Sequence, residues 1–154
     1  MKTAYFILIN CCCLAVASCD AQKLPTAANI PVQCALNKAQ SAAKYRMWIS
    51  LKGKEISGIM AVKYVDNAWR GSMINEFGVK AFDFIAAEEG KCRLLNTVSF
   101  LDKWYIRKTV ESDLAAILWR LPVKGKHFET TGSGQCRLVN EKRKIEYLFQ
   151  QIEP

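Results

Sequence analysis

The sequence predicts an α+β domain in which a curved antiparallel sheet of about seven strands, an open half-barrel, packs against one long helix. Two patterns support this prediction. From Ser41 onward, short runs alternate apolar and polar residues with a period of two, which is typical of half-buried strands, and turn-forming residues separate the runs. Between Asp102 and Leu121, apolar residues recur every three or four positions, which is typical of a helix with one apolar face. A chain of 154 residues is long enough for one such domain.

Five strands are expected before the helix. Asp66 and Asn67 favour a tight turn, so we expect the second and third strands to form a hairpin. In the first strand, one face carries only apolar residues, namely Tyr45, Met47, Ile49 and Leu51. The expected strands span residues 45–51, 56–64, 69–75, 79–87 and 92–100.

The predicted helix spans residues 102–121 and carries the apolar positions Ile106, Val110, Leu114, Ile117, Leu118 and Leu121. Asp102 can cap its first turn, and Pro122 prevents the helix from continuing past Leu121. After the helix we expect a basic loop and a Thr/Gly/Ser-rich link, over residues 124–127 and 130–134. Two more strands, residues 136–140 and 144–152, complete the domain.

The N-terminal segment has the pattern of an export signal. An apolar run follows Lys2 and ends at small residues before a cysteine, Val16-Ala17-Ser18-Cys19. This pattern resembles the lipobox of bacterial lipoproteins, which implies cleavage before Cys19 and acylation of that cysteine, for example with palmitate. The chain then divides into a signal peptide (1–18), the lipidated Cys19 with a polar tether (19–40) and one β-rich domain (41–154). The alternative is an ordinary secretory signal, because Ala15-Val16-Ala17 also fits a small-x-small cleavage site.

The lipobox predicts a location in the bacterial cell envelope, with the protein anchored to a membrane by lipid and facing the periplasm. Asp20 resembles an inner-membrane retention signal of some sorting systems, but the inner and the outer membrane both stay open. The formal net charge of +8 favours anionic partners such as lipid headgroups. We do not expect nucleic acid as a partner, because the location lies outside the cytoplasm.

Three of the seven cysteines, Cys34, Cys92 and Cys136, lie beyond the signal peptide and the lipidation site, so at most one internal disulfide is expected. The segments 90–96 and 134–140 are identical at five of seven positions, and each has its cysteine at the same place. If these two strands are neighbours, Cys92 and Cys136 can form the disulfide. The spacing does not decide this, and all three cysteines can also stay reduced.

The sequence contains no catalytic pattern, so we predict a protein that is not an enzyme. His127 is the only histidine, and we find no acidic residue at a spacing that would orient it. Cysteine and histidine show no metal-ligand spacing, and no Gly-rich phosphate loop follows a strand. Asp83 and Asp113 are embedded in apolar stretches, but nothing in the sequence links them. We therefore expect neither a metal nor a cofactor.

Large apolar residues exceed what one covered sheet face and one helix stripe need. Either they fill the core, or they leave a pocket for acyl chains, which methionine side chains suit because they adapt their shape. The residues predicted to line such a pocket are Met47, Met60, Met73, Phe82, Phe84, Trp104 and Leu118.

The lipobox, the antiparallel run that contains residues 56–63 (ISGIMAVK) and the late apolar helix are together similar to the outer-membrane lipoprotein carrier and receptor proteins. That resemblance implies an open half-barrel that holds acyl chains beneath helices. We therefore expect a non-catalytic binding module for a lipid or an acylated partner such as a lipoprotein. The alternative is a protein-interaction or inhibitor lipoprotein with a filled core, in which a loop such as residues 124–127 binds an envelope protein.

Overall fold

The computed structural model describes residues 34, 36, 42–88 and 90–152. The predicted signal peptide, Cys19 and most of the predicted tether lie outside the described residues. The described elements are, in chain order, β1 (Ala42–Leu51), β2 (Lys54–Val65), β3 (Ala68–Asn75), β4 (Lys80–Ala87), β5 (Cys92–Leu95), α1 (Trp104–Trp119), β6 (Lys126–Thr130), β7 (Cys136–Asn140) and β8 (Ile145–Ile152).

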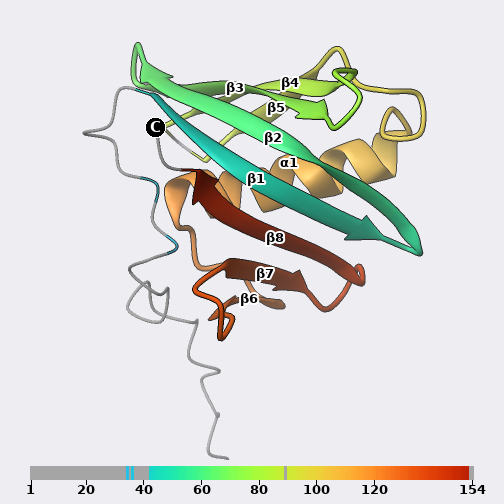
Figure 1. Cartoon of the computed structure of the whole chain (residues 1–154), viewed down its shortest axis with the longest axis vertical. Coiled ribbons are helices and arrows are strands. Elements are labelled where there is room, and N and C mark those ends of the chain that lie inside the picture. The colour runs from blue at the N-terminus through green and yellow to red at the C-terminus, as the bar shows by residue number, and fades with distance from the viewer. Residues whose placement is uncertain (1–33, 35, 37–41, 89, 153–154) are drawn as a thin grey trace, which may run out of the picture.

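The eight strands form one antiparallel sheet in the order β5-β4-β3-β2-β1-β8-β7-β6. Two meanders, β1 to β5 and β6 to β8, join where β1 pairs with β8, and the sheet is not closed because β5 and β6 are its two edges. The helix α1 crosses one face of this sheet, behind it in the view of Figure 1. The predicted α+β class and antiparallel sheet are therefore confirmed, with eight strands where about seven were expected.

The additional strand is β6, which occupies part of the predicted basic loop and the predicted link. It pairs with β7 from Lys126 opposite Asn140 to Thr130 opposite Cys136. Its residues are charged or polar except for Phe128, and as an edge strand it buries none of them completely. An edge strand of this kind lacks the apolar alternation by which strands are recognised in a sequence.

The helix and the fifth strand are shorter than predicted. Lys103 rather than Asp102 occupies the N-cap position of α1, without a side-chain hydrogen bond, and Arg120 ends the helix in the left-handed conformation with a φ of 53°. Pro122 follows two residues later and cannot continue the helix, because proline lacks a backbone N–H group. Strand β5 ends at Leu95 because Asn96 also adopts a positive φ of 49°.

The predicted turn at Asp66 and Asn67 is confirmed. Both residues have a positive φ, 51° and 56°, as the tight turn of a two-residue hairpin requires. Strands β2 and β3 then pair so closely at Gly58 that a Cβ atom there would collide with the backbone carbonyl of Ile74. Only glycine fits this position without a shift of the β3 backbone.

The core lies between α1 and the sheet face that it covers, which we call the inner face. The predicted apolar stripe of the helix is directed there, with Val110, Leu114, Ile117 and Leu118 buried. Alternate residues of the strands meet it, and Trp69 and Tyr147 are among the largest completely buried side chains. Burial of this apolar surface supplies the main stabilisation of the fold. Among the described helices, none is long and apolar enough to cross a membrane.

Candidate functional site

Six of the seven residues predicted to line an acyl pocket lie in the core. Met47, Met60, Met73, Phe82, Phe84 and Leu118 are at most 3% exposed and belong to one contiguous cluster of buried side chains. Trp104 lies apart from them at the start of α1, with 72% of its surface exposed. The seven residues therefore do not meet in one pocket, because the side chains of the sheet and of α1 fill the space between them.

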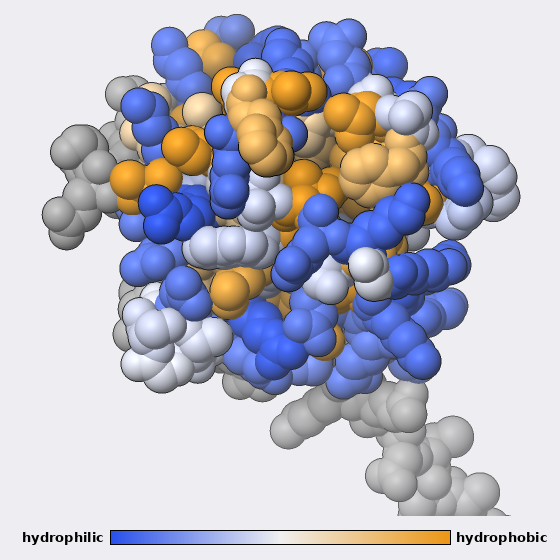
Figure 2. All heavy atoms as spheres, turned by 45° about the vertical axis from the view of Figure 1, so that its right-hand side comes forward, coloured by the Kyte–Doolittle hydropathy of each residue, from blue (hydrophilic) through white to orange (hydrophobic). Residues whose placement is uncertain are grey.

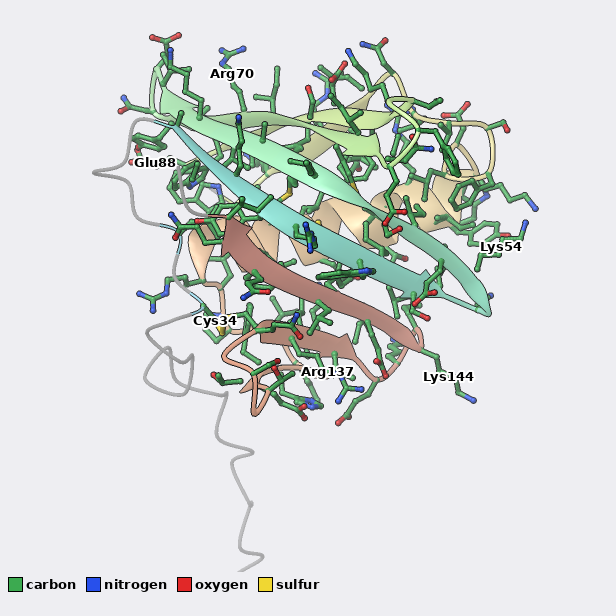
Figure 3. The ribbon with its side chains drawn as sticks, in the orientation of Figure 1. Cys34, Lys54, Arg70, Glu88, Arg137 and Lys144 are labelled. Atoms are coloured by element: carbon green, nitrogen blue, oxygen red, sulfur yellow. A yellow bond between two sulfur atoms is a disulfide. The ribbon has the colours of Figure 1, made fainter. Side chains whose placement is uncertain are left out.

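The disulfide that the sequence left possible between Cys92 and Cys136 does not form, because Cys136 is bonded to Cys34 with a Cα–Cα distance of 5.3 Å. Cys92 lies in β5 at one edge of the sheet, and Cys136 lies in β7 beyond β4, β3, β2, β1 and β8. The two cysteines are therefore not on neighbouring strands, which was the condition for a bond between them. Figure 3 places Cys34 beside the part of the sheet that contains β7.

Cys92 is a buried free thiol. Desolvation, and secondarily the charge of Glu111, raises its pKa to about 12. A thiol with so high a pKa contributes almost no thiolate at neutral pH and is a poor nucleophile. Cys92 therefore acts as a small apolar core residue.

A groove, which we call the outer groove, lies on the sheet face opposite α1. It encloses about 1270 Å³ and crosses the middle of the sheet from β8 and β1 to β5. The alternation of the strands directs side chains of two kinds into it. The apolar ones include Ile59, Ala61, Ile85, Leu95 and Ile152, and the cationic ones are Lys44, Lys63 and Arg70.

Large apolar side chains are unusually exposed near this side of the sheet. Ile59 and Ile74, which are directly opposite each other in β2 and β3, are 45% and 41% exposed. In the turn after β3, Phe77 and Val79 are 89% and 55% exposed. Figure 2 shows hydrophobic side chains gathered in the upper half of the face that it presents, among hydrophilic ones. Exposed apolar surface such as that of Ile59 in the outer groove is typical of a binding site, whereas Phe77 and Val79 do not line this groove.

Two cations are paired across the strands of the outer groove. Lys63 in β2 is directly opposite Arg70 in β3, and both are exposed. Figure 3 shows Arg70 extending away from the sheet. No carboxylate of the described residues forms an ion pair with either side chain. Like charges directly opposite each other destabilise a sheet, and a bound anion would relieve their repulsion.

Asp83 is the one carboxylate among the described residues that line the outer groove. Both of its oxygen atoms already accept hydrogen bonds from neighbouring side chains. It accepts from Ser72 Oγ at 2.5 Å, Asn96 Nδ2 at 2.9 Å and Lys80 Nζ at 3.0 Å. Desolvation alone would raise the pKa of Asp83, but these hydrogen bonds outweigh it and hold the pKa below its ordinary value of 3.8. Asp83 therefore stays ionised without neutralising the Lys63–Arg70 pair.

Asp113 is completely buried, and the structure links it to three other elements. Its Oδ1 atom accepts from Asn140 Nδ2 at 2.8 Å and lies 2.7 Å from Lys126 Nζ, and its Oδ2 atom accepts from Tyr147 Oη at 2.8 Å. Desolvation, and secondarily the charge of Asp113, raises the pKa of Tyr147 well above 10, so the hydroxyl keeps its proton and donates. This cluster ties α1 to β6, β7 and β8. No sequence spacing predicted it, because its members come from four elements.

His127 has two acidic partners, which corrects the expectation that none would orient it. Its Nε2 atom lies 2.8 Å from Glu129 Oε1 and its Nδ1 atom 3.3 Å from Glu141 Oε1. Arg137 then bridges Glu129 and Glu146 at 3.1 and 2.7 Å. The hydrogen bond with His127, and then those with Arg137, lower the pKa of Glu129 against a partial desolvation. All of these side chains are at least 36% exposed, and we assign the cluster to the stability of the β6–β7–β8 surface.

Comparison with known proteins assigns no family to this chain. No family model matches the sequence, and no curated protein matches it significantly.

Proposed function

We propose that the protein is a non-catalytic binding module for a lipid or an acylated partner, and that the outer groove is its binding site. The observation that carries this proposal is the combination, in one groove, of the exposed Ile59 and half-buried apolar side chains with the Lys63–Arg70 pair. An anionic amphiphile matches both features, because its acyl chain is apolar and its headgroup is negatively charged.

The apolar part of the groove would take the acyl chain. Ile59 exposes 45% of its surface to water, and Ile85, Leu95 and Ile152 are half-buried around the same groove. Each methylene group that leaves water contributes about 0.8 kcal/mol. A few methylene groups in the groove would therefore suffice for measurable binding.

The cationic part would take the headgroup. Arg70 can bind a phosphate or a carboxylate through two parallel hydrogen bonds, and Lys63 opposite it adds a second positive charge. In the free protein these two cations repel each other, so binding of an anion also removes an unfavourable interaction.

The resemblance to outer-membrane lipoprotein carriers supports the same ligand class but a different place. In those proteins the acyl chains lie inside the half-barrel, beneath helices. Here α1 and buried side chains such as Met60 and Phe82 occupy that side, so we assign the ligand to the opposite face. The lipid anchor expected on Cys19 would keep the outer groove close to the membrane that supplies such ligands.

A second candidate function is protein interaction, and the edge strand β6 favours it. One side of β6 pairs with β7, and its other side is an edge of the sheet. An extended segment of a partner can add to such an edge through backbone hydrogen bonds. This candidate requires no ligand in the outer groove.

Native mass spectrometry of the processed full chain, released from nonionic detergent in the presence of phosphatidylglycerol, tests the proposal. We expect one bound phospholipid, and we expect Ile59→Glu to lose it because the substitution places a negative charge in the groove. Val79→Glu is the matched control, because Val79 is a similarly exposed apolar residue outside the groove. Absence of bound lipid in the unmodified protein, or equal loss in both variants, would refute the outer groove as a lipid site.

A further inference from the structure

A second pocket, which we call the Lys126 pocket, lies between α1 and the turn that joins β7 to β8. It encloses about 240 Å³. Five cationic side chains line it, and Asp113 is the one carboxylate among the described residues that do so. The cations are Lys108 from the helix, Lys124 and Lys126 from the start of the last meander, and Lys142 and Arg143 from the turn.

Lys126 is the buried base of this pocket. Its side chain is only 8% exposed, and its ammonium group contacts Asp113 Oδ1 at 2.7 Å and Ser112 Oγ at 2.8 Å. An ammonium group has three N–H donors, so these two contacts leave one donor for a ligand. Asp113 also accepts hydrogen bonds from Asn140 and Tyr147, so its negative charge is shared among three donors. The positive charge of Lys126 is therefore only partly neutralised and can still attract an anion.

Aromatic side chains border the same pocket. Trp104 is 72% exposed and Tyr105 39% exposed, and their rings meet edge to face with centroids 6.0 Å apart. Lys108 Nζ lies 5.9 Å from the centroid of the Trp104 ring, which holds this cation at the border of the pocket. An exposed tryptophan beside cations suits a ligand that carries an apolar or ring-shaped group next to its charge.

We propose that the Lys126 pocket binds the phosphate group of a phosphate ester. Several cations around one small volume match a group with more than one negative charge, and charge-assisted hydrogen bonds from Lys and Arg are the usual way in which proteins bind phosphate. The volume of 240 Å³ is smaller than that of typical pockets for drug-sized ligands, so it fits the phosphate and one adjoining group rather than an acyl chain. The phosphate can belong to a soluble ester or to a lipid headgroup.

This proposal does not depend on the outer groove. The Lys126 pocket is on the α1 side of the sheet, and the two pockets share no lining residue. A substitution in one is therefore expected to leave binding at the other unchanged, and the two proposals can fail separately.

Calorimetric titration of the processed full chain, in nonionic detergent at low ionic strength, tests the pocket with glucose 6-phosphate, and with glucose as the uncharged control. We expect glucose 6-phosphate alone to bind. Arg143→Gln should weaken this binding about tenfold, the loss of one charge-assisted hydrogen bond. The substitution leaves the turn intact, because the backbone N–H of Arg143, not its side chain, donates to Asn140 Oδ1.

Lys144→Gln is the matched control. It removes one positive charge from the same turn, and Lys144 points away from the domain at the lower right of Figure 3 and does not line the pocket. We expect it to change the affinity by less than about twofold. No binding of glucose 6-phosphate, or equal weakening by both variants, would overturn the proposal.

Dihexanoyl phosphatidic acid, used as a monomer, distinguishes the two sources of the phosphate. If it displaces glucose 6-phosphate and binds more tightly, with the same sensitivity to Arg143→Gln, the pocket takes a lipid headgroup. If glucose 6-phosphate binds more tightly, the pocket takes a soluble phosphate ester. Because Trp104 borders the pocket, we also expect ligand binding to change the tryptophan fluorescence. Trp104→Phe should remove this change while calorimetric binding persists. An unchanged fluorescence response would exclude Trp104 from the site.

Discussion

The hydroxyl group of Tyr147 in β8 donates a 2.8 Å hydrogen bond to the carboxylate of Asp113 in α1, and both residues are completely buried. This contact joins two residues that are 34 positions apart in the chain. It places a charged acceptor in the core, where Tyr147, Asn140 and Lys126 are the partners of the carboxylate among the described residues. Buried charge that depends on so few partners makes the cluster sensitive to the loss of any one of them.

We predict that Tyr147→Phe lowers the free energy of unfolding by about 1–3 kcal/mol, because a buried carboxylate oxygen loses its donor. Urea denaturation followed by circular dichroism measures this. Tyr45→Phe is the control, because the buried hydroxyl of Tyr45 has no hydrogen-bond partner among the described residues. Its removal should change stability little. Equal effects of the two substitutions would contradict the assigned role of the Tyr147 hydroxyl.

Lys126→Met should be more destabilising, by about 3–5 kcal/mol, because it leaves the buried charge of Asp113 without a cation. Adding Asp113→Asn should recover part of this loss, since the neutral amide no longer needs that cation. A double-mutant cycle from urea denaturation measures the coupling between the two residues. Strictly additive effects would indicate that the 2.7 Å ion pair does not contribute as a unit.

The lowered pKa of Asp83 predicts a dependence of stability on acid. Since its pKa in the folded protein lies below the ordinary value of 3.8, the folded state binds this proton less readily than the unfolded state. The stabilisation is complete above the unfolded pKa and is lost as pH falls through the folded pKa. Asp83→Asn should therefore be less stable than the unmodified protein at pH 6, and the difference should shrink below pH 3.8 in urea titrations. A constant difference across this range would contradict the assignment.

The disulfide and the burial of Cys92 together predict how Cys34, Cys92 and Cys136 react with thiol reagents. Iodoacetamide at pH 8 should leave native Cys92 unmodified, because burial raises its pKa to about 12, and peptide mapping should recover Cys34 linked to Cys136. Replacing both bonded cysteines by serine should lower stability by about 2–5 kcal/mol, as the bond closes a long loop. A linked peptide that contains Cys92 would overturn the pairing.

Gly58→Ala should destabilise the protein by about 1–3 kcal/mol, because the new methyl group collides with the carbonyl of Ile74 and must push β3 away. Gly132→Ala is the matched control, because a Cβ atom there meets no other atom within 4 Å. Thermal unfolding of the two variants measures the contrast. If both shift the melting temperature equally, the close approach of β2 and β3 at Gly58 is not a constraint.

The fold class and most elements followed from local patterns. Apolar alternation identified the strands that bury one face, and the spacing from Val110 to Leu118 identified the buried stripe of α1. The Asp66–Asn67 turn was predictable because a left-handed turn favours those residue types. The one missed strand, β6, is a charged edge strand whose stability comes from pairing with β7, and such pairing leaves no periodic apolar signal.

The sequence by itself determined which residues are apolar, with what period, and hence that a sheet would bury one face against a helix. Only the tertiary structure decided which strands that are distant in the chain are neighbours, because the pairing of β1 with β8 joins segments that are about a hundred residues apart. That pairing separates Cys92 from Cys136, brings Asp113 to Lys126 and Tyr147, and fills the predicted pocket with methionine and phenylalanine side chains. The β2–β3 hairpin, by contrast, is a local feature, and it places Lys63 opposite Arg70 on the uncovered face. Side-chain periodicity is a local property of the chain, whereas strand order is set by the free energy of the whole packed sheet.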